Sequence, residues 1–151
     1  MKRDLRFEFT YPHPPERVWR ALTDPAALRE WLMDTTFSEA TVGHQFQFRT
    51  DPKPGFKGIV YCEVTDVDPP RKLAYTWRGG WTDRPTLVTY TLEPVPEGTR
   101  LRLEHTGFRG LGGFALSMVL GSGWKSNILS RSLPRALMTL ERVEGEVQPV
   151  Q

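Results

Sequence analysis

The last third of the chain carries the pattern that most constrains its fold. Apolar side chains recur at every fourth position, at Leu116, Leu120, Trp124 and Ile128. This spacing is typical of the buried face of an amphipathic helix. A helix over Gly113–Val143 would be roughly 45 Å long at about 1.5 Å per residue, longer than any strand expected in this chain. We therefore predict a long helix around which a curved sheet wraps.

A proline within this run predicts a local disturbance of the helix. Pro134 has no backbone N–H, and its ring clashes with the carbonyl group four residues earlier. We expect a bend or a break near Leu133, with the helix continuing beyond it.

Size and composition exclude several classes of protein. The chain has 151 residues, of which 38% are hydrophobic and 25% charged, as in one ordinary globular domain. Its 20 basic and 18 acidic residues are intermixed, which argues against nucleic acid as a partner. No apolar run reaches the roughly 18 residues needed to cross a bilayer, so membrane insertion is not expected. The first residues contain no apolar signal segment, and we expect a cytoplasmic protein.

The rest of the chain predicts strands, with two short helices after the first of them. Leu5, Phe7, Phe9 and Tyr11 alternate with polar residues, as in a strand with one buried face. Two short helices follow, over 15–24 and 26–31, and Asp24 is the expected N-cap of the second. From Phe37 to His105 the chain reads as consecutive strands joined by tight turns. This order predicts an α+β fold with an antiparallel sheet of about seven strands.

Several short segments, in this order and spacing, are similar to a known superfamily. They are Pro15–Pro25 with Trp31, the turn Val67–Leu73 followed by Tyr75–Trp77, Gly98–Leu101, His105–Phe108 and Gly123–Trp124. The chain resembles the START-like or SRPBCC superfamily, which includes polyketide cyclases and lipid-transfer domains. The branch that it resembles most contains homologues of the activator of the heat-shock protein 90 ATPase. Gly43-His44 departs from the Gly-Gly pair common in that family, which predicts a changed turn within the same fold.

The resemblance implies a helix-grip fold, in which a bent antiparallel sheet grips the C-terminal helix. It implies a single domain over residues 1–143, followed by a short tail over 144–151. It also implies an apolar cavity between sheet and helix that takes a small hydrophobic ligand. Bulky inward-facing rings also favour a concave apolar site. The predicted lining residues are Phe46, Phe48, Val60, Cys62, Tyr75, Trp77, Val88, Tyr90, Leu103, His105, Leu120, Trp124 and Ile128.

Three of these residues could have a chemical role or a packing role. His105 faces inward, where it could bind a ligand or act as an acid or base near neutral pH. Alternatively, a backbone carbonyl group satisfies it in the core. Tyr75 and Tyr90 could orient a ligand's carbonyl or hydroxyl group, or could bond to each other or to water.

Three functions remain open from the sequence. The leading hypothesis is a protein that binds a hydrophobic ligand without established catalysis. The second is a cyclase, aromatase or hydrolase that acts on a hydrophobic carbonyl compound, with His105 as its only candidate acid–base residue. The third is an interaction module that modulates a chaperone ATPase. No cofactor or metal is expected, because the single cysteine and the separated histidines lack metal-ligand spacing. A homodimer is left open.

Overall fold

The computed structural model describes residues 4–52, 54, 56–79 and 84–147. The elements in chain order are β1 (Leu5–Tyr11), α1 (Pro15–Thr23), α2 (Pro25–Trp31), β2 (Asp34–Thr35), β3 (Gln45–Arg49), β4 (Ile59–Asp68), β5 (Lys72–Trp77), β6 (Thr86–Val95), β7 (Gly98–Thr106), α3 (Gly110–Gly123), η1 (Trp124–Ser132) and α4 (Leu133–Val147). The predicted α+β fold, with two short helices after the first strand and a long C-terminal helix, is confirmed.

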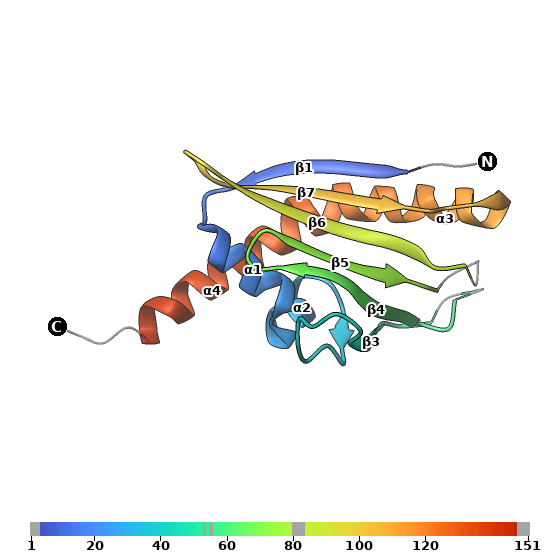
Figure 1. Cartoon of the computed structure of the whole chain (residues 1–151), viewed down its shortest axis with the longest axis horizontal. Coiled ribbons are helices and arrows are strands. Elements are labelled where there is room, and N and C mark those ends of the chain that lie inside the picture. The colour runs from blue at the N-terminus through green and yellow to red at the C-terminus, as the bar shows by residue number, and fades with distance from the viewer. Residues whose placement is uncertain (1–3, 53, 55, 80–83, 148–151) are drawn as a thin grey trace.

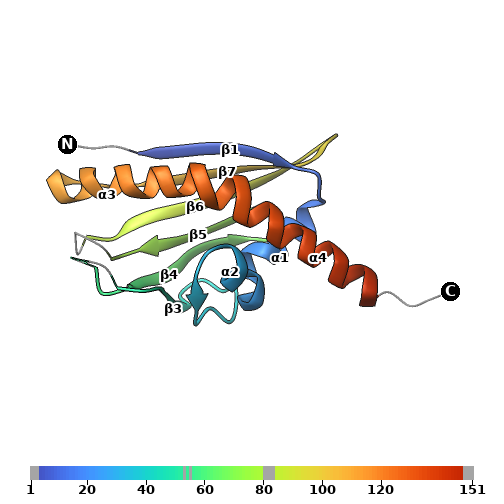
Figure 2. The ribbon, with the colours of Figure 1, turned by 180° about the vertical axis from the view of Figure 1, so that it is seen from behind.

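The strands form one antiparallel sheet of seven strands in the order β1-β7-β6-β5-β4-β3-β2. The first strand of the chain therefore pairs with the last, and Leu5 lies opposite His105. The helical rod formed by α3, η1 and α4 crosses one face of the sheet (Figures 1 and 2), and α1 and α2 pack against its α4 end. This is the helix-grip arrangement.

The two short helices begin where their sequences predict. Pro15 occupies the first turn of α1, where a missing N–H costs nothing because that group has no helical partner. Asp24 caps α2, since its side-chain oxygen accepts a hydrogen bond from the Ala26 backbone at 2.9 Å. The indole N–H of Trp31 then donates to the Ala21 carbonyl oxygen at 2.7 Å and holds the two helices together.

The long helix changes its winding before Pro134. Over η1 the helix is π-helical, and the Leu133 N–H donates to the carbonyl group of Ile128, five residues earlier. Figure 2 shows the direction of the rod changing between α3 and α4. The disturbance thus lies on the N-terminal side of the expected position, and α4 continues to Val147, past the predicted helix end at Val143.

Candidate functional site

An apolar pocket lies between α3 and the sheet. Val60 and Trp77 line it from β4 and β5, and Leu116, Val119 and Leu120 line it from α3. Met33, Thr50, Pro54, Phe56 and Gly79 complete the lining. The volume is about 240 Å³, just below the roughly 300–1,000 Å³ typical of small-molecule sites. No charged side chain lines this pocket among the described residues.

Trp77 separates this pocket from the aromatic interior of the protein. Its side chain is only 4% exposed. Its ring centroid lies 5.8 Å from that of Phe48, 5.5 Å from that of His105 and 5.9 Å from that of Trp124. The pocket therefore ends at Trp77, and the residues behind this ring belong to the packed core.

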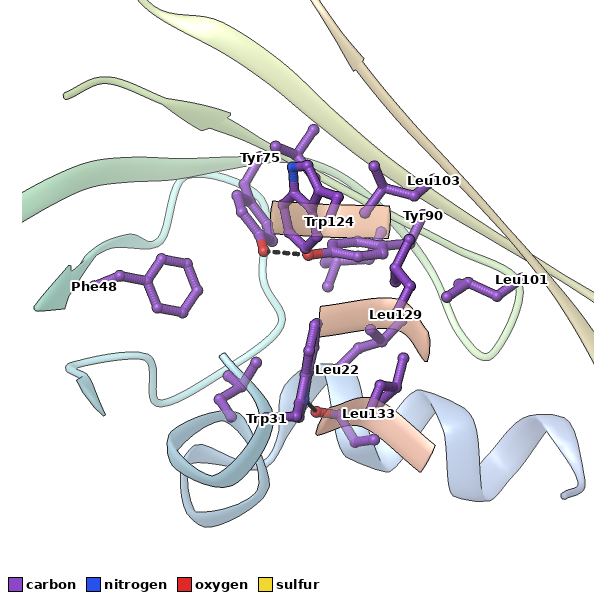
Figure 3. Close-up of a cluster of buried hydrophobic side chains, with 14 of the residues drawn as sticks. Leu22, Trp31, Phe48, Tyr75, Tyr90, Leu101, Leu103, Trp124, Leu129 and Leu133 are labelled. Carbon is purple, nitrogen blue, oxygen red and sulfur yellow. Dashed lines mark hydrogen bonds between the residues drawn. The ribbon is translucent and has the colours of Figure 1, made fainter. Parts of the chain in front are cut away.

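Tyr75 and Tyr90 form a hydrogen-bonded pair in that core. Their hydroxyl oxygens are 2.8 Å apart, and Figure 3 shows the two hydroxyl groups directed at each other. Both side chains are buried. Burial raises the pKa of each phenol above its ordinary value, so both remain protonated. In this structure the two phenols are thus bonded to each other inside the core.

His105 is fully buried, and both of its ring nitrogens have partners. The Trp124 indole N–H donates to Nδ1 at 3.2 Å, so Nδ1 carries no proton. Nε2 lies 2.7 Å from the Thr86 hydroxyl oxygen, and that hydroxyl donates to the Trp77 carbonyl oxygen at 3.0 Å. Nε2 therefore carries the proton. Burial lowers the pKa of His105 to about 3, so the ring is neutral at physiological pH.

A second, wider hollow of about 650 Å³ lies over β3, β4 and β5, where the side chains alternate to the solvent side. Most of its described lining residues are polar or charged, and several of them are bonded to one another. Arg49 donates to the Gln47 side-chain oxygen at 2.8 Å. The Arg78 guanidinium stacks 4.6 Å from the centre of the Tyr61 ring. This hollow has a mixed lining, to which the predicted residues Phe46 and Cys62 also contribute.

Comparison with known proteins identifies the family. Residues 12–134 match the family described as activator of Hsp90 ATPase homolog 1-like protein. The chain belongs to this family. No curated protein is detectably similar to the chain in sequence.

Among solved structures, protein MLL2253 from Mesorhizobium loti is 35% identical, with 97% of this chain and 100% of that chain covered and a TM-score of 0.72. Protein BH1534 from Bacillus halodurans is 26% identical, with 91% and 99% covered and a TM-score of 0.74. DynU16, from the dynemicin biosynthetic locus, is 26% identical, with 90% of this chain but 47% of that chain covered and a TM-score of 0.72. The resemblance to the START-like superfamily, and to this branch of it, is thereby confirmed.

The predicted lining residues of this family member lie in four different places in the structure. Val60, Trp77 and Leu120 line the apolar pocket. A further group is sealed in the core: Phe48, Tyr75, Val88, Tyr90, Leu103, His105 and Trp124. Phe46 and Cys62 are buried and border the polar hollow, where burial raises the pKa of the Cys62 thiol. Ile128 is half-buried against the core.

The apolar pocket therefore touches three of the predicted lining residues, and the rest of its described lining comes from α3 and from segments between the regular elements. The interior rings fill the volume beneath the sheet because they meet edge to face. Phe46 lies 5.1 Å from Tyr75, and Trp31 lies 6.4 Å from Tyr90, with interplanar angles of 80° and 83°. The apolar pocket lies where aliphatic side chains of α3, such as Leu116 and Leu120, face β4 and β5.

Several pocket residues were not predicted from the sequence. Leu116 belongs to the apolar row of the helix, and this periodicity could have identified it as a lining residue. Met33, Thr50 and Phe56 lie between regular elements, where no periodicity reports burial. Thr86, the partner of His105, was also missed, because the alternation of a strand shows its face but not its hydrogen bonds.

The described part of the chain contains neither a membrane-spanning helix nor a metal site. No helix there is long and apolar enough to cross a membrane. Three or more His, Cys, Asp or Glu side chains are nowhere grouped so as to hold a metal ion.

Proposed function

We propose that the protein binds a small hydrophobic molecule in the apolar pocket between α3 and strands β4 and β5. The observation that supports this most is the lining: its described side chains are almost wholly aliphatic and aromatic, and Thr50 adds the one hydroxyl group among them. Transfer of apolar surface from water into such a pocket gains about 25 cal/mol per Å². A ligand that buries roughly 150 Å² of apolar surface would gain about 4 kcal/mol before the costs of association.

The size of the pocket limits the ligand. A volume of about 240 Å³ suits a molecule with one aromatic ring or a short chain, rather than a long lipid or a fused polycyclic compound. Trp77 fixes this limit, because its ring closes the inner end of the pocket.

The two other functions have less support. An acid–base enzyme would need a titratable group at the pocket, but none of the described lining residues has one. His105 is neutral, and both of its nitrogens are engaged. Modulation of a chaperone ATPase is suggested by the family description alone, and a shared fold does not establish a shared function.

A thermal-shift screen tests the proposal. Short fatty acids and single-ring ketones, with a flavonoid as a compound too large for the pocket, are each tested on the wild-type protein and on two variants. Leu120→Trp fills the pocket, because Leu120 lines it. Met118→Trp is the matched control, since Met118 lies on the same helix, is 53% exposed and does not line the pocket.

We expect at least one ligand to raise the Tm of the wild type and of Met118→Trp by several degrees, with little effect on Leu120→Trp. If no ligand stabilises the wild type, or if Leu120→Trp responds equally, the proposal is wrong.

A cytoplasmic location stays a prediction, as does a homodimer. Light scattering coupled to size-exclusion chromatography measures the assembly directly.

A further inference from the structure

Trp77 is a buried residue that lines the apolar pocket, and its indole N–H has no hydrogen-bond partner among the described residues. Trp31 and Trp124 donate their indole N–H groups to Ala21 and His105, but the side chain of Trp77 makes no such bond there. Every fully sealed side-chain nitrogen and oxygen of the described residues has a hydrogen-bond partner. The Trp77 nitrogen is therefore not fully sealed, although the residue is only 4% exposed.

The open space next to Trp77 is the apolar pocket. Buried indole N–H groups usually find a partner, because leaving one unpaired costs about 1–3 kcal/mol. A ligand in the pocket can supply the missing acceptor. The geometry points to a neutral ligand with a small apolar body and one acceptor oxygen, such as an aromatic ketone or aldehyde, to which the Trp77 indole N–H donates. This inference rests on the proposed function and specifies its ligand class.

The surroundings of Trp77 hold this donor in place before a ligand arrives. Its backbone carbonyl accepts the Thr86 hydroxyl at 3.0 Å. Phe48, His105 and Trp124 pack around the ring with centroid distances of 5.5–5.9 Å, so the indole cannot change rotamer without disturbing all three. A preorganised donor loses little freedom on binding, so more of the hydrogen bond contributes to affinity.

The same lining argues for a neutral ligand rather than a carboxylate. No lysine, arginine or histidine lines the pocket among the described residues, so a bound anion would lose its hydration without gaining a counter-charge. His105, whose ring centroid is 5.5 Å from that of Trp77, does not line the pocket and is itself neutral.

The test compares two ligands of the same shape. Acetophenone carries a carbonyl oxygen where α-methylstyrene carries a methylene group, and benzoate serves as a charged analogue. Each is titrated into the full-length protein labelled with nitrogen-15, and the indole N–H resonances are followed by NMR. The Trp77 resonance is assigned by its absence from Trp77→Phe. Trp19→Phe is the control, because Trp19 lies in α1 and does not line the pocket.

We expect acetophenone and α-methylstyrene both to shift resonances of Leu116 and Leu120, with only acetophenone moving the Trp77 indole proton downfield. Trp77→Phe should lower the affinity for acetophenone about fivefold relative to that for α-methylstyrene, as the loss of one net hydrogen bond implies. Trp19→Phe should leave this ratio of affinities unchanged. Benzoate should bind at least tenfold more weakly than acetophenone.

The outcomes separate the inference from the function. If neither neutral ligand perturbs the pocket, the proposed function fails and the inference fails with it. If both bind, but the Trp77 proton and the affinity ratio do not distinguish them, only the inference is overturned. Benzoate binding as tightly as acetophenone would overturn the assignment of a neutral ligand.

Discussion

The Tyr11 hydroxyl donates to the backbone carbonyl of Leu129 at 2.7 Å, which joins the first strand to the π-helical segment. In the π register the Leu133 N–H bonds to Ile128, so the next bond would run from residue 134 to Leu129. Residue 134 is proline and has no N–H. Tyr11 therefore supplies the donor that the helix lacks, inside the core, where an unpaired carbonyl group is costly.

Tyr11→Phe should lower the free energy of unfolding by about 1–3 kcal/mol, because it leaves the Leu129 carbonyl without a partner. Urea denaturation followed by circular dichroism measures this. Tyr61→Phe is the control, since Tyr61 is 39% exposed, and should change stability by less than about 0.5 kcal/mol.

The role of Pro134 is tested by repeating Tyr11→Phe in a Pro134→Ala background. Alanine restores a backbone N–H, so the loss of the tyrosine hydroxyl should cost less there, with a coupling of about 1 kcal/mol. Equal costs in the two backgrounds would show that the proline does not create the need for Tyr11.

The Tyr75–Tyr90 pair predicts strong coupling between two substitutions. Tyr75→Phe or Tyr90→Phe alone leaves the other hydroxyl group in the core without a partner. Each should lower the free energy of unfolding by about 1–3 kcal/mol. The double variant removes both polar groups while keeping both rings, so its cost should be well below the sum of the single costs. Chemical denaturation of the wild type, the two single variants and the double variant completes a double-mutant cycle. Additive changes in the free energy of unfolding would contradict the pairing.

Burial of His105 predicts a dependence of stability on pH. Its pKa is lowered from 6.5 to about 3 in the folded state, so between these values the unfolded chain binds a proton that the folded protein does not. This contribution to stability is fully present above about pH 6.5 and is lost as the pH falls, by about 1.4 kcal/mol per pH unit.

Comparison of the wild type with His105→Gln isolates the contribution of His105 to the pH dependence of stability. The pKa of His13 is also lowered, mainly by burial, but His13 is present in both proteins and its effect cancels. Between about pH 5 and pH 6, the wild type should lose about 1.4 kcal/mol per pH unit more than His105→Gln. Parallel pH profiles would mean that His105 ionises in the folded protein.

The sequence predicted the elements well because hydrophobic periodicity reports which face of a helix or strand is buried. The alternation in the last strand predicted that His105 faces inward, and in the structure His105 is buried. It could not show that Trp124 and Thr86 occupy both ring nitrogens, because each is 19 residues away along the chain. Only the folded arrangement brings them together.

The pocket was harder to predict for a different reason. Alternation identifies inward side chains, but whether such side chains leave space depends on how their rings interlock. Phe46, Phe48 and Tyr75, three of the predicted lining residues, meet within 5.1–6.0 Å and pack against one another. The π-helical segment η1 could not be predicted from the sequence either. It involves two residues far apart in the chain: Pro134 in the helix, and Tyr11 in the first strand, which bonds to the Leu129 carbonyl group.

Two glycines should respond in opposite ways to alanine. Gly98 begins β7 with a φ of +141°, and a Cβ atom there would collide with the Tyr11 backbone oxygen and lie 2.8 Å from the His13 nitrogen. Gly98→Ala should therefore destabilise the protein by about 2 kcal/mol or more, because both neighbours are backbone atoms that cannot rotate away.

Gly145 lies in α4 with open space around it. Gly145→Ala should stabilise by about 0.5–1 kcal/mol, since alanine is the better helix former. Thermal and urea denaturation of both variants check the signs, and a tolerated Gly98→Ala would mean that the β1–α1 connection can move away from β7.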